Sequence, residues 1–168
     1  MKKDAIITLP NSHLRQKSQR VHVITDETRQ LVADMTSASI DWENSRPHEI
    51  SAALAAVQID RLERVVIVRE DFDDKDNRTF IPLINPEIVK YEGELISDYE
   101  GCLSVSGRIY GKVPRYSRVR VKALDINGNT IRLKADGFLA RVLQHEIDHC
   151  NGIVFIDRIR DDTSAFYQ

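Results

Sequence analysis

The chain has 168 residues, of which 42% are apolar and 30% are charged, and its formal net charge is −2. These values are ordinary for one soluble globular domain, which we expect to span residues 1–168. A net charge this small does not indicate a surface that binds nucleic acid. No apolar run is long enough to cross a bilayer. Neither nucleic acid nor a membrane is therefore expected as a partner.

The cysteines and the first residues indicate the compartment. The chain has two cysteines and begins Met-Lys-Lys-Asp, without the long apolar run of a signal peptide. A disulfide between Cys102 and Cys150 is possible on the number of cysteines alone. A reducing, cytoplasmic compartment is the better interpretation of so few cysteines without a leader.

The N-terminal half predicts a helix, a loop and a strand. Thr25 or Asp26 is expected to cap a helix that runs to about Ser39. Its inward apolar stripe consists of Leu31, Val32 and Met35. The polar residues 41–48 predict a loop, and the apolar run within residues 64–69 predicts a buried strand.

The C-terminal half predicts a hairpin before a second helix. Residues 119–123 alternate apolar with charged side chains, as in a half-exposed strand, and Asn127-Gly128 offers a hairpin turn to residues 131–133. The helix is expected over residues 137–150. We predict an α+β fold in which antiparallel β-sheets pack around this central helix.

The second helix carries the most informative pattern in the chain. Asp136 is a candidate N-cap, and Asn151-Gly152 supplies a left-handed stop. His145 and His149 are four residues apart, so they share one helix face and can bind one metal ion. Paired histidines in a buried helix can instead hydrogen-bond within a core, so a third ligand is needed to decide between these readings.

We expect this helix to be buried over most of its circumference. At about 100° per residue, Phe138 and Val142 fall on the strip of the two histidines, as walls of a pocket or as ordinary core. Arg141, Gln144 and Asp148 fall together on one side. Glu146 lies at the edge of the apolar side, where desolvation should raise the pKa of its carboxyl and suit it to act as a general base.

The third ligand is expected upstream of the helix. The longer zinc-protease pattern requires a histidine where the chain has Phe155, and no glutamate follows Glu146 to serve a second protease class. The upstream candidates are His13, His22, His48, Cys102 and several carboxylates. Cys102 is the best candidate, because a thiolate binds zinc and ferrous iron strongly and Gly101 lets the backbone pass close to a bound group. Cys150 points to another side of the helix and is expected to be a small buried residue.

The motifs around these residues carry a family resemblance. Residues 100–104 read Glu-Gly-Cys-Leu-Ser, residues 144–149 read Gln-His-Glu-Ile-Asp-His, and Cys102 precedes His145 by 43 positions. With these motifs the chain resembles the peptide deformylase family. The family's first motif, G-x-G-L-A-A-x-Q, resembles residues 51–58. The resemblance covers nearly the whole chain and includes residues 83–87, 113–115 and 155–158.

The resemblance implies a metal-dependent hydrolase that removes the N-formyl group from the formyl-methionine of nascent polypeptides and releases formate. It implies the metal ligands Cys102, His145 and His149. Iron(II) is implied in the cell, with zinc, nickel or cobalt in purified protein. Glu146 is implied as the base that deprotonates the attacking water. The side-chain amide of Gln58 and the backbone N–H of Leu103 are implied as donors to the oxyanion.

Substrate contacts are expected from Ala53, Gly101, Phe138 and Val142. Phe138 and Val142 would wall a pocket for the methionine side chain. Ser51 and Ala53 replace the two glycines of the first motif, and Ala53 would be strained if its φ were positive. Arg108 is a candidate substrate-binding arginine.

Two alternative functions follow from the same residues. The altered first motif is consistent with a deformylase-like protein of changed substrate or without turnover. A peptidase that cuts internal amide bonds would share the metal and the base, but would need a groove open at both ends. The chain ends nine residues after Ile159, which leaves little of the C-terminal helix that some bacterial members dock on the ribosome. This argues against ribosome contact.

Overall fold

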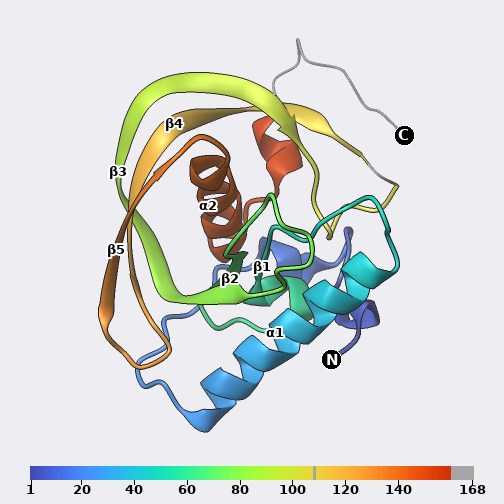
Figure 1. Ribbon diagram of the computed structural model, residues 1–168, viewed down its shortest axis with the longest axis vertical. Coiled ribbons are helices and arrows are strands. Elements are labelled where there is room, and N and C mark those ends of the chain that lie inside the picture. The colour runs from blue at the N-terminus through green and yellow to red at the C-terminus, as the bar shows by residue number, and fades with distance from the viewer. Residues whose placement is uncertain (108, 160–168) are drawn as a thin grey trace.

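The computed structural model describes residues 1–107 and 109–159 (Figure 1). The candidate Arg108 lies outside the described residues, and so do residues 160–168, which bear on the possible but doubtful ribosome contact. Both statements stay predictions.

The described strands form one antiparallel sheet in the order β1-β2-β3-β4-β5. Their bounds are Ala53–Ala55, Val65–Arg69, Phe80–Glu100, Gly111–Leu124 and Thr130–Asp136. The predicted strands at residues 64–69, 119–123 and 131–133 are confirmed, as is the turn at Asn127-Gly128, where Gly128 has φ 87°. A single sheet replaces the several sheets expected. Three register shifts between β3 and β4 bend the pair, and the sheet curves around α2 (Figure 1).

Within residues 1–107 and 109–159, two α-helices accompany the sheet, α1 at Asp26–Asn44 and α2 at Gly137–Cys150. The bounds predicted for the second helix are confirmed. The short 3-10 helices η1 to η4 span Lys3–Ala5, Ser12–Arg15, Ala56–Ile59 and Phe155–Arg158. In the part of the chain that the structure describes, no helix combines the length and the apolar character needed to span a membrane.

The first helix is capped as predicted but is longer than predicted. The backbone N–H of Thr25 donates to Thr28 Oγ1 at 3.2 Å, within a capping box. The helix continues to Asn44, through half of the residues expected to form a loop. Glu43 is buried there in an ion pair with Arg69, and this tertiary contact outweighs the polar local sequence.

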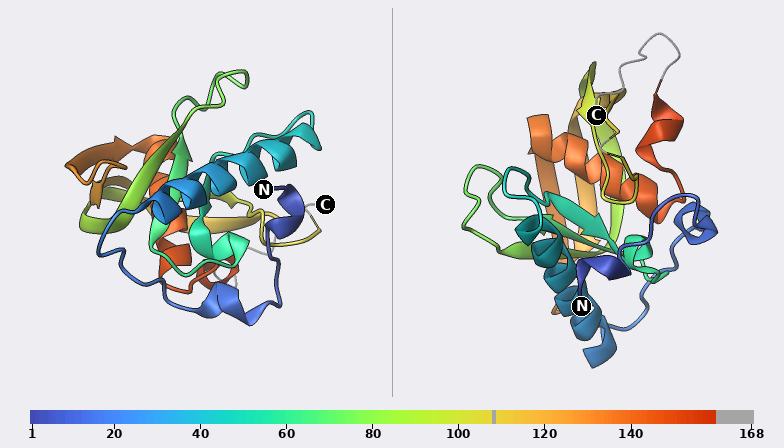
Figure 2. Two further views of the ribbon diagram at one scale, coloured as in Figure 1. Left: turned by 90° about the horizontal axis from the view of Figure 1, so that it is seen from below. Right: turned by 90° about the vertical axis from the view of Figure 1, so that its right-hand side faces the viewer.

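The two helices pack on opposite faces of the β1–β2 end of the sheet (Figure 2). Alternate residues of these strands face opposite sides of the sheet, so each strand contributes side chains to two hydrophobic cores. The core against α2 includes Ala53, Ala55, Val66, Val68 and Leu143. The core against α1 includes Leu54, Val65, Ile67, Leu31 and Met35. The α+β class is therefore confirmed, and β2 is buried on both faces.

Candidate functional site

The fold brings Cys102, His145 and His149 together. The ligand atoms of the three side chains all lie within 4.8 Å of one another, and His149 Nε2 lies 3.2 Å from Cys102 Sγ. The two histidines come from α2, and Cys102 follows the end of β3. Metal–nitrogen and metal–sulfur bonds are about 2.0–2.3 Å long, so one divalent ion can reach three donors at this spacing. The donor set therefore fits a transition-metal ion.

The other upstream candidates lie elsewhere. His13, His22 and His48 are exposed and lie outside this group of ligand atoms. His13 contacts Asp60 instead, through its Nδ1 atom. These three histidines have no place in the candidate metal site.

Cys150 has the buried, apolar environment expected of it. Its side chain is fully buried in the core against α2, and burial raises the pKa of its thiol to about 12. Both cysteines are free thiols, so the Cys102–Cys150 disulfide is excluded.

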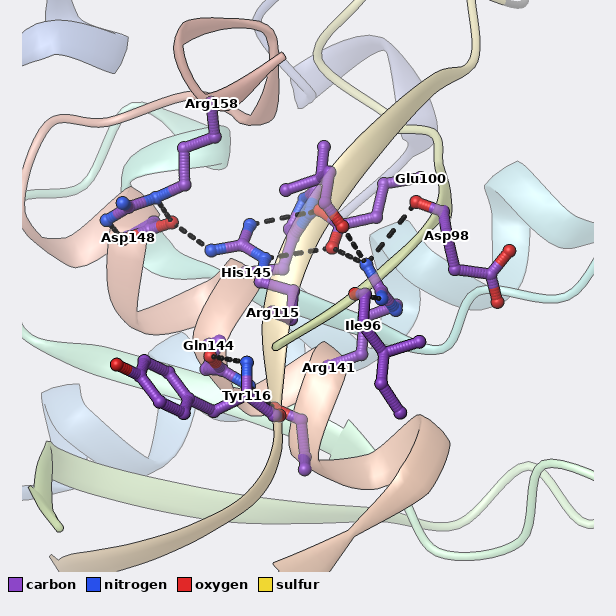
Figure 3. Close-up of polar contacts among 12 residues, drawn as sticks. Ile96, Asp98, Glu100, Arg115, Tyr116, Arg141, Gln144, His145, Asp148 and Arg158 are labelled. Carbon is purple, nitrogen blue, oxygen red and sulfur yellow. Dashed lines mark hydrogen bonds and ion pairs between the residues drawn. The ribbon is translucent and has the colours of Figure 1, made fainter. Parts of the chain in front are cut away.

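A buried carboxylate orients the first histidine (Figure 3). Glu100 Oε2 lies 2.9 Å from His145 Nδ1, while Arg115 donates to both oxygens of Glu100 at 2.9 and 3.0 Å. Arg141 adds a third contact at 2.8 Å. Burial opposes the charge of Glu100, but the hydrogen bonds from His145 and Arg115 lower its pKa to about 2. Such a partner fixes the ring of a metal-binding histidine.

The same network continues along α2 to the surface. Asp148 accepts from Arg115 at 2.5 Å and from Arg158 at 2.5 and 2.6 Å. Gln144 pairs with both backbone groups of Tyr116 (Figure 3). Sequence reasoning assigned no role to these contacts. The clustering of Arg141, Gln144 and Asp148 on one side of a largely apolar helix was the signal that could have found them.

Glu146 is buried beside the candidate metal ligands. Its Oε2 atom has no hydrogen-bond partner among the described residues, and burial raises the pKa of its carboxyl to about 7. The expected direction of this pKa shift is therefore confirmed. Proton transfer near neutral pH is what such a carboxylate can perform.

A pocket of about 500 Å³ opens beside these groups. Nine of the ten predicted site residues line it: Ala53, Gln58, Gly101, Cys102, Leu103, Phe138, Val142, His145 and Glu146. The tenth, His149, is fully buried behind them. Residues from β1, η3, the β3–β4 connection and α2 thus meet in one cavity, although they lie far apart in the sequence.

Gln58 is held against the thiol. Its Oε1 accepts from the backbone N–H of Ala55 at 2.8 Å. Its Nε2 donates to Ser104 Oγ at 3.1 Å and lies 3.5 Å from Cys102 Sγ. The side-chain amide is therefore fixed with its donor end toward the candidate metal site.

The altered first motif is accommodated without backbone strain. Ala53, in β1, pairs with Val68 of β2. The φ angle of Ala53 is not positive, so its methyl group causes no backbone strain. Ser51 is fully buried and donates its N–H to Glu43 Oε2 at 3.2 Å. A Cβ at Gly101 would lie 2.6 Å from the ring of Tyr110, so any other residue at this position would require that ring to move.

A pocket that joins two imidazoles, a thiolate and a buried carboxylate has the groups that a hydrolytic metalloenzyme requires. The polypeptide deformylase family model matches residues 3–165, and the chain belongs to this family.

Relatives and solved structures agree over most of the chain. A peptide deformylase from Thermomicrobium roseum is 44% identical over 165 residues, which cover 96% of this chain and 89% of the relative. One from Halothermothrix orenii is 43% identical over 87% of this chain and 86% of its own length. The crystal structure of a peptide deformylase from Synechococcus elongatus in complex with actinonin has a TM-score of 0.83 at 35% identity, covering 93% of this chain and 80% of that one.

Proposed function

We propose that this protein is a metal-dependent peptide deformylase that hydrolyses the N-formyl group of formyl-methionyl peptides during protein synthesis. One observation carries the proposal: the three ligand atoms and the carboxylate of Glu146, whose Oε2 atom has no partner among the described residues, meet beside one pocket. The whole chain would act as a single catalytic domain in the cytoplasm. Its central element would be α2, the helix that bears His145, Glu146 and His149.

The ligand set suits a divalent ion held by Cys102, His145 and His149. When bound, such an ion would act as a Lewis acid, which lowers the pKa of water and polarises a carbonyl group. We propose iron(II) in the cell, with zinc, nickel or cobalt as replacements in purified protein. Thiolate and imidazole ligands accept each of these metals.

The residues around the ligands would perform the hydrolysis. Glu146 takes a proton from the attacking water as the oxygen bonds to the formyl carbon. Gln58 Nε2 and the backbone N–H of Leu103 donate to the oxyanion that forms. The C–N bond then breaks, Glu146 passes its proton to the departing nitrogen, and formate and a free amino terminus are the products.

The pocket walls would select the substrate. Phe138 and Val142 would contact the methionine side chain, since they line the pocket beside His145. Ala53 and Gly101 would lie along the peptide backbone. Because β1 stands at the edge of the sheet formed by the described strands, its outer side can accept an extended peptide.

The replaced glycines of the first motif favour a second candidate, a deformylase-like protein of changed substrate or without turnover. One comparison separates the candidates: hydrolysis of formyl-Met-Ala, acetyl-Met-Ala and an internal peptide bond by the same metal-loaded sample. Cleavage of the formyl substrate alone supports the deformylase. Cleavage of the internal bond supports a peptidase, and a loaded site that cleaves none supports the second candidate.

A further inference from the structure

An ion pair without solvent contact links α1 to β2. Arg69 Nη1 lies 2.8 Å from Glu43 Oε2, and both side chains are 0% exposed. Removing two charges from water is costly, and a buried pair is weak evidence of added stability. The contacts that surround this pair indicate what it holds in place.

Arg69 joins the pair to the loop formed by residues 70–79. Its guanidinium donates to the carbonyl of Asp71 at 3.1 Å and to that of Lys75 at 2.7 Å. Two further contacts tie this loop to the end of α1 and to the segment that follows it: Arg78 donates to Asn44 Oδ1 at 2.8 Å, and Lys75 Nζ donates to the carbonyl of Pro47. The loop is therefore anchored along its length.

Glu43 joins the pair to the segment that enters β1. Its Oε2 atom accepts from the N–H of Ser51 at 3.2 Å, and the N–H of Arg69 donates to the carbonyl of Ala52 at 2.8 Å. Ala52 and Ala53 line the pocket. The buried pair therefore contacts both the loop and the segment that enters β1 beside the pocket.

The loop supports a pocket wall through Phe72. The ring of Phe72 meets that of Phe138 edge to face, with centroids 4.9 Å apart and an interplanar angle of 89°. Phe138 lines the pocket and is 54% exposed, whereas Phe72 is half-buried and does not line it. Phe72 therefore stands behind the wall and limits where the ring of Phe138 can move.

We infer that the Glu43–Arg69 pair and Phe72 are positioning residues, which hold Phe138 so that the pocket prefers a methionine-sized side chain. This inference rests on the proposed function. Without Phe72 the ring of Phe138 can move away from the pocket. A long substrate side chain such as methionine then loses contacts with this ring, whereas a short one such as alanine never makes them. Discrimination in apolar pockets depends on such contacts.

The first test compares Phe72→Ala and Phe72→Leu on formyl-Met-Ala and formyl-Ala-Ala. Phe72→Ala should lower the ratio of the two kcat/KM values about threefold to tenfold through a higher KM for the methionine substrate. The metal content should not change, and Phe72→Leu should restore most of the preference. Tyr91→Ala, which removes an exposed aromatic ring from β3, is the matched control. An unchanged ratio in Phe72→Ala would overturn the role of Phe72.

The second test replaces the ion pair as a unit, because removing one charge leaves the other buried and unpaired. Glu43→Leu with Arg69→Met keeps apolar volume at both positions. Hydrogen exchange of the amides in residues 70–79 should then rise about tenfold or more, and the methionine preference should fall as in Phe72→Ala. A folded double variant with unchanged exchange and preference would overturn the role of the pair.

The two proposals fail in different ways. If the parent protein, loaded with metal, releases no formate from either peptide, the proposed function is wrong. If the parent prefers the methionine peptide and Phe72→Ala keeps that preference, only the positioning inference is wrong.

Discussion

The imidazole of His145 is held by Glu100 across the fold: His145 Nδ1, on α2, lies 2.9 Å from Glu100 Oε2, at the end of β3. With Nδ1 engaged, Nε2 is the ring atom left to bind a metal ion. Glu100 stands two residues before Cys102, so one short segment supplies both a ligand and the group that orients another ligand.

Glu100→Gln should weaken metal retention. The amide keeps the shape of the side chain but not its charge, and loss of such a partner lowers metal affinity about 10- to 100-fold. It also removes one of the two buried carboxylates that Arg115 contacts, the other being Asp148, which should cost about 1–3 kcal/mol of unfolding free energy. Chelator competition and chemical denaturation measure the two effects. The control is Glu92→Gln in an exposed pair with Arg120, and equal metal affinity in both variants would contradict the role of Glu100.

The two cysteines should respond differently to alanine. Cys102→Ala should lose the metal, because the thiolate is one of three ligands. Cys150→Ala should keep the metal and lose about 1 kcal/mol of stability through a small cavity. The metal content per chain, measured for both variants after identical purification, shows which cysteine is a metal ligand. Retention of the metal by Cys102→Ala would refute Cys102 as a ligand.

Glu146→Gln should keep the metal and lose turnover. The amide cannot take a proton from water, and general-base catalysis contributes about 10²- to 10⁴-fold. Formate release and metal content are measured on the same sample. Residual activity near that of the parent would assign the base to another group.

Glu146 should also make the metal-free protein less stable as the pH rises. The pKa of its carboxyl is about 7 in the folded chain and 4.5 as its ordinary value. The folded state therefore binds the proton more tightly, so this contribution is fully present below about pH 4.5 and is lost as the pH rises through about 7. At about 1.4 kcal/mol per pH unit, the loss amounts to about 3 kcal/mol.

The variant Glu146→Gln isolates this pH effect. Denaturant unfolding of the metal-free parent and variant at pH 4, 6 and 8 should show the difference shifting in favour of the variant as the pH rises. A difference independent of pH would show that the carboxyl titrates normally in the folded chain.

Gln58→Ala should slow hydrolysis without loss of metal. Removal of one oxyanion donor costs about 3 kcal/mol, or about 10²- to 10³-fold in kcat. Gln58→Glu tests the donor directly, because it keeps the acceptor for the Ala55 N–H and removes the donating amide. Full activity in either variant would exclude Gln58 from oxyanion stabilisation.

Local signals were enough to predict α2 but not β3. The helix at Gly137–Cys150 has apolar periodicity and a Gly stop, and its bounds are those predicted. The long strand Phe80–Glu100 contains Pro82, Pro86 and Gly93, and most of its second half is exposed. Its side chains do not alternate between buried and exposed along the strand, as they do in a half-buried strand. Its pairing with β4 depends on residues far away in the sequence.

The candidate ligands were predictable, whereas the groups that hold them were not. The chemistry of thiolate and imidazole singled out Cys102, His145 and His149, and the structure brings these three side chains together. The clustering of polar residues on one side of α2 could mark Asp148 as a polar contact, but not its partners. Glu100 and Arg115 join Asp148 only when β3, β4 and α2 are packed, and no sequence spacing encodes that meeting. The burial of Glu43 and Arg69 depends on tertiary packing in the same way.

The most direct test of the proposed function is formate release from formyl-Met-Ala by anaerobically purified protein, with metal counted in the same sample. We predict turnover with about one metal ion per chain, lost on chelation and restored by iron(II). A fully loaded site that releases no formate would contradict the proposal.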